Sequence, residues 1–267
     1  MIMQKMAFFD IDGTLTRPDG SIAPAVIAAV KAAAKKGVKI VLASGRPTFG
    51  MLELARTFGL DENDGYVISY NGCGIYHVPT GKYLVQHYVK KETLLLLDAE
   101  IQCYPNISPI FYDNEQILTT KRNYYVDFEA ELNNSLAYER DYYPDGSPKL
   151  IWAAEGSELD LIETQIQQKF NAHCTIARSL PCFLEFTPLG IDKGAAIQEI
   201  CTLLNHPIAA TVAFGDGNND KTMLQMAGVG VAMENGRAEV KAIADYIAPS
   251  NQQDGVIVAI EKFLLQE

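Results

Sequence analysis

The chain has 267 residues, of which 48% are hydrophobic and 21% are charged, a composition typical of folded globular proteins and unlike that of disordered, collagen-like or coiled-coil chains. Its 22 Lys and Arg residues against 33 Asp and Glu residues give a formal net charge of −11, which repels nucleic-acid phosphates and anionic lipid surfaces. We therefore expect neither a nucleic acid nor a membrane as partner, and a bound phosphate group would need a local cationic site.

Cysteine usage and the lack of long apolar runs indicate the compartment. The five cysteines are odd in number and form no C-x-x-C pair, and we expect no secretory leader before them, so we expect reduced thiols. No stretch approaches the roughly 18 consecutive apolar residues of a membrane helix. These features predict a cytoplasmic protein, which we expect to be a monomer or a small homo-oligomer.

The first part of the chain alternates predicted strands and helices. A short apolar run over 6–11 ends at an Asp-Gly pair, as expected of a buried strand that stops in a tight turn. An Ala-rich helix follows over 24–36, with Pro at its start and Gly after its end. Next come a strand over 38–43, a helix from 47 to about 58 and a strand over 66–69.

The same rhythm returns at the other end of the chain. We expect helices over 193–204, 221–227, 237–244 and 255–265, and strands over 211–214 and 229–233. Such alternation produces βαβ units and a parallel sheet covered on both faces. The predicted fold class is α/β, with a Rossmann-like doubly wound sheet built from residues 1–81 and 189–267.

Residues 82–188 differ in texture and predict a separate α+β domain inserted into that core. Strands are expected over 83–89, 110–112, 150–154, 175–177 and 183–186, and helices over 93–102 and 158–170. The segment holds nine of the 13 tyrosines and the single tryptophan, Trp152. Such amphipathic aromatic side chains can line a ligand cleft, or they can fill a small two-layer core.

Two carboxylates, Asp10 and Asp12, lie where the first strand leaves the sheet, which is where ligands bind in open α/β folds. Their spacing places both on one face while the strand lasts. After the second strand, the run Ser-Gly-Arg-Pro over 44–47 would gather a hydroxyl and free amides at a helix start, which favours an anion. An ordinary Asp-Gly turn and an ordinary helix start are the alternatives when each motif is taken alone.

Two later motifs add a cation and more acids. Lys193 falls in the first turn of a helix that Asp192 would cap, where a cation opposes the helix dipole by roughly a few tenths of a kcal/mol. Such a locally unfavourable residue points mildly to function, against the alternative of an exposed lysine. The run Gly-Asp-Gly-Asn-Asn-Asp over 215–220 offers the oxygen ligands that a hard divalent cation prefers. An EF-hand loop is excluded, because Lys221 and Ala227 stand where it needs Gly and Glu.

Other searches exclude several classes of site. The chain contains no P-loop, no G-x-G-x-x-G and no H-E-x-x-H, and the residues before Ser44 lack the glycine of a serine-hydrolase nucleophile elbow. The four histidines, at 77, 87, 173 and 206, show no metal-ligand spacing. We expect each of them to be structural or exposed.

Taken together and in order, these motifs resemble the four signature motifs of the haloacid dehalogenase-like phosphohydrolase superfamily, and within it the Cof-type phosphatases. They are Asp-x-Asp-Gly-Thr over 10–14, Ser-Gly-Arg-Pro over 44–47, Lys-Gly over 193–194, and Gly-Asp-Gly-x-Asn-Asp over 215–220 followed by Met223-Leu224. Smaller matches are Tyr-Asn-Gly over 70–72, Val-Ala-Met-Glu-Asn-Gly over 231–236 and Asp-Gly-Val over 254–256. The insert lies in the place of the family's C2-type cap. Ser44 departs from the Thr of many relatives but keeps the hydroxyl.

The resemblance implies a role for each site residue. Asp10 is implied as the nucleophile that forms an aspartyl-phosphate, and Asp12 as the acid that protonates the leaving alkoxide and then the base that activates water. Because a carboxylate and a phosphate repel each other, a bridging cation is needed, and Mg²⁺ is expected. Its implied ligands are the Asp10 side chain, the Asp12 carbonyl and Asp216, with Asp220 in reach of a metal-bound water. The residues implied to bind substrate are Ser44, Gly45, Arg46, Asn71, Gly72, Lys193 and Asn219, of which Ser44 and Lys193 also belong to the catalytic set.

These roles predict a Mg²⁺-dependent phosphatase acting on a small phosphorylated metabolite, such as a sugar phosphate or a phosphorylated cofactor. A phosphomutase or phosphotransferase of the same superfamily and a non-catalytic phosphometabolite-binding protein are the alternatives. A dehalogenase is disfavoured, because carbon–halogen cleavage needs no acid such as Asp12, and a transport ATPase would need membrane helices. Since the core motifs meet only the phosphoryl group, we expect the insert to act as a lid and to select the rest of the substrate.

Overall fold

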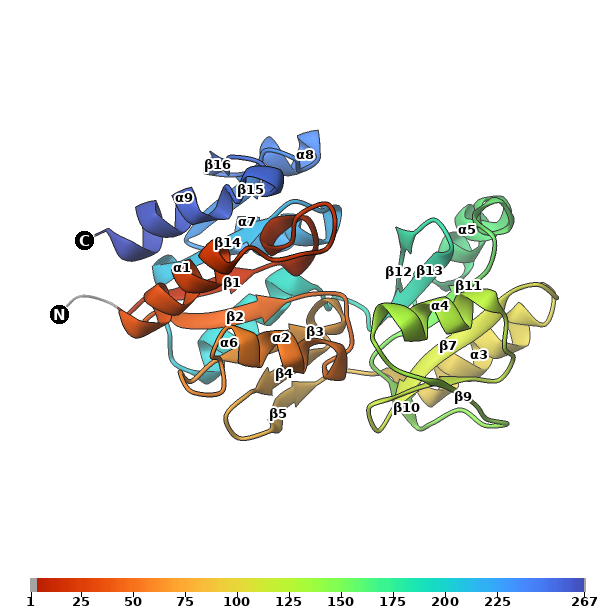
Figure 1. Ribbon diagram of the computed structural model, residues 1–267. Coiled ribbons are helices and arrows are strands. Elements are labelled where there is room, and N and C mark those ends of the chain that lie inside the picture. Colours follow the sequence, from red (N-terminus) through yellow and green to blue (C-terminus); the bar gives the residue numbers. More distant parts are fainter. Residues whose placement is uncertain (1–3, 267) are drawn as a thin grey trace. The chain divides into compact units, whose positions relative to one another are not determined.

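The computed structural model describes residues 4–266, which form two compact units (Figure 1). The core unit comprises the chain through Val85 and again from Asp192, and the inserted unit is Gln86–Ile191. The expected start of the insert at residue 82 is corrected by β5 (Lys82–Gln86), which pairs with β4 at the edge of the core sheet. Its residues alternate between exposed and half-buried, as expected of an edge strand with one covered face.

The core unit is built on an eight-stranded sheet with the order β16-β15-β14-β1-β2-β3-β4-β5. Six strands are parallel, namely β1 (Met6–Phe9), β2 (Lys39–Ala43), β3 (Tyr66–Ser69), β14 (Thr211–Gly215), β15 (Val229–Met233) and β16 (Tyr246–Ala248). The short strand β4 (Gly74–His77) is antiparallel to β3. Phe9 of β1 pairs with Leu42 on one side and with Phe214, from the far end of the chain, on the other. One sheet is thus assembled from both ends of the sequence, which confirms the predicted α/β class.

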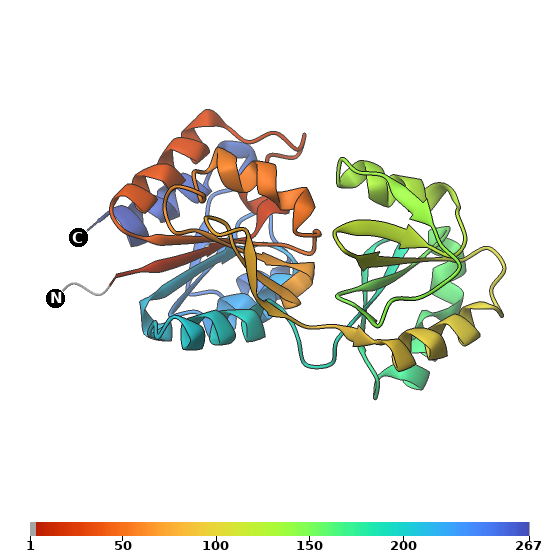
Figure 2. The ribbon, with the colours of Figure 1, turned by 90° about the horizontal axis from the view of Figure 1, so that it is seen from below.

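Alternate residues of these strands enter two hydrophobic cores, one on each face of the sheet. Phe9 and Phe214 belong to the first core, whereas Phe8 and Ala213 belong to the second. The first core is covered by α1 (Pro24–Lys35), α2 (Leu52–Thr57) and α9 (Val256–Ile260), and the second by α6 (Lys193–Leu203), α7 (Lys221–Met226) and α8 (Ala238–Lys241). Figure 2 shows α1 and α6 on opposite sides of the sheet. Because both faces of the central strands are buried, these strands read as continuous apolar runs.

The inserted unit is a six-stranded sheet with helices on both faces. Its order is β12-β13-β11-β7-β8-β9, with bounds β7 (Ser108–Asp113), β8 (Gln116–Thr119), β9 (Ala137–Glu139), β11 (Leu150–Ala153), β12 (Thr175–Leu180) and β13 (Phe183–Thr187). A separate pair joins β6 (Val89–Lys90) to β10 (Gly146–Ser147). Helices α3 (Lys91–Ile101) and α5 (Gly156–Phe170) pack on the face that carries Trp152 and Phe186. Helix α4 (Tyr124–Leu132) packs on the other face, where its Phe128 meets Phe183.

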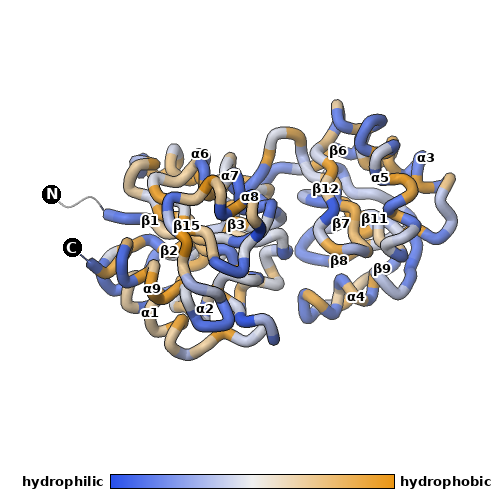
Figure 3. The backbone as a smooth tube through the Cα atoms, turned by 90° about the horizontal axis from the view of Figure 1, so that it is seen from above, coloured by the Kyte–Doolittle hydropathy of each residue, from blue (hydrophilic) through white to orange (hydrophobic). Residues whose placement is uncertain are grey.

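The aromatic residues of the insert could line a ligand cleft or fill a core, and their burial distinguishes these two interpretations. Trp152 is fully buried and its ring packs against those of Tyr104 and Phe186, so it fills the core of this unit. Figure 3 shows hydrophobic residues gathered along the inner strands of both units. Within residues 4–266, no helix combines the length and apolar character needed to cross a bilayer. The five cysteines of this part of the chain form no disulfide with one another.

Candidate active site

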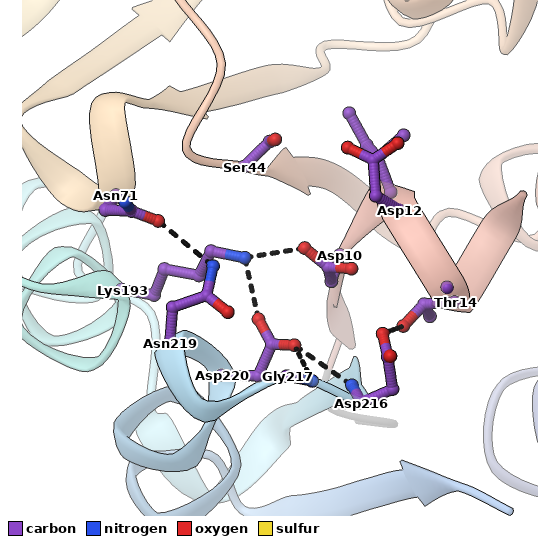
Figure 4. Close-up of polar contacts among 12 residues, drawn as sticks. Asp10, Asp12, Thr14, Ser44, Asn71, Lys193, Asp216, Gly217, Asn219 and Asp220 are labelled. Atoms are coloured by element: carbon purple, nitrogen blue, oxygen red, sulfur yellow. Dashed lines mark hydrogen bonds and ion pairs between the residues drawn. The ribbon is translucent and has the colours of Figure 1, made fainter. Parts of the chain in front are cut away.

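The predicted site residues of the core meet at the carboxyl edge of its parallel sheet (Figure 4). Asp10 directly follows β1, and its N–H donates to the carbonyl of Phe214 in β14 at 2.9 Å. Ser44 directly follows β2, and its N–H donates to the carbonyl of Ile68 in β3, also at 2.9 Å. Ladder hydrogen bonds therefore extend one residue beyond the strands and fix the backbone from which these side chains project.

Lys193 occupies the centre of the site as a wholly buried cation. Its Nζ lies 2.6 Å from Asp10 Oδ1 and 2.6 Å from Asp220 Oδ1, and the three residues are 0%, 5% and 1% exposed, respectively. Helix α6 starts at Lys193 because the carboxylate of Asp192 caps it by accepting from Ala195 N–H at 2.8 Å. The alternative of an exposed lysine is thus excluded, since the first turn of α6 delivers the ammonium into a carboxylate pair.

Asp220 organises the loop after β14 with its other oxygen. Oδ2 accepts hydrogen bonds from the N–H groups of Asp216, at 2.9 Å, and Gly217, at 2.8 Å. Asp216 Oδ1 in turn accepts from the hydroxyl of Thr14, at 3.0 Å. With both oxygens engaged, Asp220 holds Lys193 and Asp216 at fixed positions on either side of itself.

The carboxylates outnumber the buried cation. Oxygen atoms of Asp10, Asp216 and Asp220 all lie within 4.8 Å of one another. Burial, reinforced by the charge of Asp220, raises the pKa of Asp10 even though Lys193 opposes the rise, and the same two causes raise the pKa of Asp216 to about 6. Burial disfavours the charged form of Lys193, but Asp10 and Asp220 more than offset it and raise the lysine's pKa. The set of oxygen donors with surplus negative charge fits a hard divalent cation.

Asp12 lies in η1, a π-type turn (Ile11–Leu15) that follows β1, and is more exposed than Asp10. The guanidinium of Arg46 donates two hydrogen bonds to its carboxylate, at 2.6 Å from Nη2 to Oδ1 and at 3.0 Å from Nε to Oδ2. Arg46, expected as a substrate ligand, is therefore brought against the expected acid and base. Their side chains are 35% and 57% exposed, so a group arriving from solvent can reach this pair.

The remaining expected ligands form a connected rim beside Lys193. Asn219 Nδ2 donates to Asn71 Oδ1 at 3.1 Å, and Asn71 N–H donates to the carbonyl of Ser44 at 3.0 Å. A Cβ on Gly72, whose φ is +114°, would lie 2.3 Å from the carbonyl oxygen of Asp192. Only glycine lets this loop approach the start of α6 so closely. Gly45 is packed in the same manner, since its Cβ would lie 3.0 Å from Asn71 Nδ2.

Sequence reasoning assigned no role to three residues that support the site. Thr14 bonds Asp216, and Asn235 Nδ2 donates to the carbonyl of Gly13 at 2.8 Å. Asn251 Nδ2 donates to the carbonyl of Thr16 at 2.7 Å. Thr14 and Asn235 lie inside motifs of the sequence, but their partners, the Asp216 carboxylate and the Gly13 carbonyl, are identifiable only once the strands are placed.

The core unit thus combines a doubly wound α/β fold with a buried Asp–Lys–Asp group and a cluster of carboxylates that fits a divalent cation, at the carboxyl edge of its sheet. A sequence profile of the haloacid dehalogenase-like hydrolases matches residues 7–260. The chain belongs to the haloacid dehalogenase-like hydrolase family, as its motifs predicted. Hydrolases of this superfamily generally use a divalent metal.

Individual relatives are similar over their full length. A Streptococcus pyogenes protein with a phosphatase designation is 34% identical, with 98% of each chain covered. The 5-amino-6-(5-phospho-D-ribitylamino)uracil phosphatase of Bacillus subtilis is 30% identical, over 98% of this chain and 96% of that one. The crystal structure of a haloacid dehalogenase-like hydrolase from Bacteroides thetaiotaomicron superimposes with a TM-score of 0.90 at 31% identity, covering 97% of this chain and 99% of the other. Both units of the chain therefore have counterparts in these relatives.

Proposed function

We propose that this protein is a phosphatase that uses Mg²⁺ to hydrolyse a small phosphorylated metabolite through an aspartyl-phosphate on Asp10. The observation that carries the proposal is the buried Lys193 ammonium, held 2.6 Å from both Asp10 and Asp220. Such a cation orients the Asp10 carboxylate and adds positive charge where the equatorial phosphoryl oxygens would lie. The phosphatase designations of the full-length relatives agree with this chemistry.

The two steps of the reaction assign different work to Asp10 and Asp12. In the first, an Asp10 oxygen bonds to phosphorus while the ester oxygen leaves with a proton from Asp12. In the second, Asp12 takes a proton from water, the water oxygen attacks phosphorus, and the bond to Asp10 breaks to release phosphate. Arg46, on both oxygens of Asp12, would hold that carboxylate toward the leaving group, and the hydroxyl of Ser44 and the amide of Asn219 would hold phosphoryl oxygens.

The carboxylates present fit Mg²⁺ as the cation. Asp10 and Asp216 would supply side-chain ligands and Asp12 its backbone carbonyl, whereas Asp220, engaged by Lys193 and two N–H groups, would act through an intervening water. When bound, the ion would neutralise the repulsion between the Asp10 carboxylate and the substrate phosphate. Burial and the charge of Asp220 raise the pKa values of Asp10 and Asp216. The two positive charges of the ion would oppose this rise.

The relatives and the two-unit organisation support the proposed substrate class. The Bacillus relative is named for a phosphorylated ribitylamino-uracil, a small phosphate ester, and we propose an ester of comparable size for this chain. The inserted unit would select among such esters, since the core motifs concern the phosphoryl group alone. This unit would then act as the cap of the enzyme.

Phosphate release tests the proposal directly. We expect release from para-nitrophenyl phosphate and from some members of a panel of phosphorylated metabolites when Mg²⁺ is present, and loss of release on chelation with EDTA. Steady release into water without a sugar bisphosphate activator would separate a phosphatase from a phosphomutase. Full activity after exhaustive chelation, or no turnover of any ester with Mg²⁺ bound, would refute the proposed function.

A further inference from the structure

The turn that carries Asp12 has an unusual construction. In η1, the N–H and hydroxyl of Thr16 both donate to the carbonyl of Ile11, at 3.0 and 3.2 Å, and the N–H of Gly13 donates to the Thr16 hydroxyl at 3.1 Å. Within the turn, Asp12 has φ −81° and ψ 112°, and Gly13 has φ +89°. These non-helical residues interrupt the regular hydrogen-bond pattern of a helix, so the orientation of their carbonyl groups depends on partners outside the turn.

Two asparagines from the far end of the chain supply those partners. Asn235 follows β15, and its Nδ2 donates to the carbonyl of Gly13 at 2.8 Å while its Oδ1 accepts from the N–H of Asn251 at 2.9 Å. Asn251 is only 7% exposed, and its Nδ2 donates to the carbonyl of Thr16 at 2.7 Å. The two side chains, linked through the backbone N–H of Asn251, thus hold a carbonyl near each end of the region from Gly13 to Thr16.

The end of the turn is secured a second time by an ion pair. Arg17, directly after Thr16, places Nε and Nη2 at 2.8 and 2.5 Å from the two carboxylate oxygens of Asp254. Asp254 ends the short 3₁₀ helix η6 (Asn251–Gln253) in a left-handed conformation with φ +54°. The same C-terminal segment therefore reaches the turn by hydrogen bonds from Asn251 and by an ion pair from Asp254.

Close packing couples the position of this turn to the metal-ligand candidates. A Cβ on Gly13 would lie 2.5 Å from Asp216 Oδ2, so the turn backbone sits directly against that carboxylate. Thr14 in the same turn bonds the other Asp216 oxygen at 3.0 Å. A shift of the turn would thus move the Asp12 carbonyl and Asp216 together.

We propose that Asn235 and Asn251 are positioning residues, which set the η1 turn so that the Asp12 carbonyl and the Asp216 carboxylate form a single cation-binding arrangement. The proposal rests on the function proposed above and goes beyond it, because the resemblance implied no role for either asparagine and neither touches Asp10, Lys193 or the phosphoryl rim in the contacts described. The segment from Asn251 to Asp254 then helps to position the cation ligands of the site.

The test compares Asn235→Ala and Asn251→Ala with Gln252→Ala and Gln253→Ala, two neighbouring exposed positions. Hydrogen exchange of peptides spanning residues 11–17, and binding of Mg²⁺ alone by calorimetry, need no turnover. Their results therefore stand apart from success or failure of the phosphatase assay. For each asparagine variant we expect exchange in this segment to be faster by about tenfold or more, Mg²⁺ binding weaker by a similar factor, and the rest of the exchange map unchanged.

A double variant adds a second criterion. Both side chains hold the same turn and are linked through the backbone N–H of Asn251. The loss of Mg²⁺ affinity in Asn235→Ala/Asn251→Ala should therefore be smaller than the product of the single losses. Asn235 is exposed, so its replacement leaves a folded protein even if Asn251→Ala lowers stability. Unchanged exchange over residues 11–17, or unchanged Mg²⁺ affinity, in the folded Asn235→Ala protein would overturn the proposal.

Discussion

Lys193 shows most clearly how one residue depends on its surroundings. An ammonium group with no exposed surface would be strongly disfavoured alone, and here it is stabilised by two carboxylates at 2.6 Å. Its sequence position at a helix start predicted a functional role, but the burial could not be predicted. That burial depends on Lys193 meeting Asp10, which lies 183 residues earlier in the sequence, and Asp220, which lies 27 residues later.

Replacing Lys193 by methionine should therefore leave two buried carboxylates without their cation. We expect the free energy of unfolding in EDTA to fall by about 3–5 kcal/mol, measured by urea denaturation. Lys221→Met is the matched control, because Lys221 also begins a helix but is half-buried, and its replacement should change stability by less than about 0.5 kcal/mol. Equal effects of the two substitutions would contradict the assigned role of the buried pair.

Asp216 predicts a pH dependence of the metal-free protein. Burial and then Asp220 raise its pKa from 3.8 to about 6, so the folded state retains a proton over a range in which the unfolded chain has lost it. The folded state is therefore progressively disfavoured as pH rises from 3.8 through about 6. Asp216→Asn lacks this titration, and its stability advantage over wild type in EDTA should be larger at about pH 7 than at about pH 4.5. A pH-independent difference in thermal melting would contradict the assigned shift.

Among the helices and strands, the sequence predicted best those with a clear apolar pattern or with Pro and Gly at their ends. The expected strand over 66–69 coincides with β3, and the helix expected at 24–36 is α1, which ends at Lys35. Short edge elements such as β16 and β9 were not predicted, because three residues carry too little periodicity. Helix α4 was not predicted, because it carries exposed aromatic residues such as Tyr124. Its apolar residues are therefore not confined to one face, which is the pattern by which surface helices are recognised. The helix expected over 237–244 is shorter, α8, and the last one gives way after Ile260 to a π-type turn.

The turn after β1 allows a matched test of steric fit. Gly13 and Gly20 have similar φ values of +89° and +80°, but a Cβ would strike Asp216 at Gly13 and would meet nothing within 4 Å at Gly20. Each alanine substitution should cost about 1 kcal/mol of backbone strain. Only Gly13→Ala should also displace Asp216, with a fall in phosphate release of at least about tenfold. Comparable activity of the two variants would show that close packing of the turn against Asp216 is unimportant.

At the scale of the whole molecule, the two units have separate hydrophobic interiors. Both cores of the core unit consist entirely of residues up to Val85 or after Asp192, and the third core lies wholly within Gln86–Ile191. The change of texture along the chain predicted an insert over 82–188, whereas the compact unit is Gln86–Ile191. What the insert recognises was not predictable, because its polar and aromatic residues come together only through pairing of distant strands.

Excising residues 87–190 and joining the ends with a short Gly/Ser linker should leave a folded core. We expect this core to unfold cooperatively, to bind Mg²⁺ and to hydrolyse para-nitrophenyl phosphate weakly, while discrimination among phosphorylated metabolites disappears. Ranking the panel by kcat/KM for both proteins measures this discrimination. An unchanged ranking would place substrate selection in core residues such as Arg46 and Asn71 and would contradict the assigned role of the insert.

The proposed mechanism requires that Asp10 form a covalent bond to phosphorus. Wild-type protein turning over para-nitrophenyl phosphate with Mg²⁺ should be quenched in acid and its peptides examined by mass spectrometry, beside an Asp10→Asn variant whose thermal melting shows that it is folded. We expect a phosphoryl adduct on the peptide containing Asp10 in the wild type, together with no adduct and no phosphate release in the variant. Phosphate release by the folded Asp10→Asn protein, at a rate near that of the wild type, would show that Asp10 is not the nucleophile.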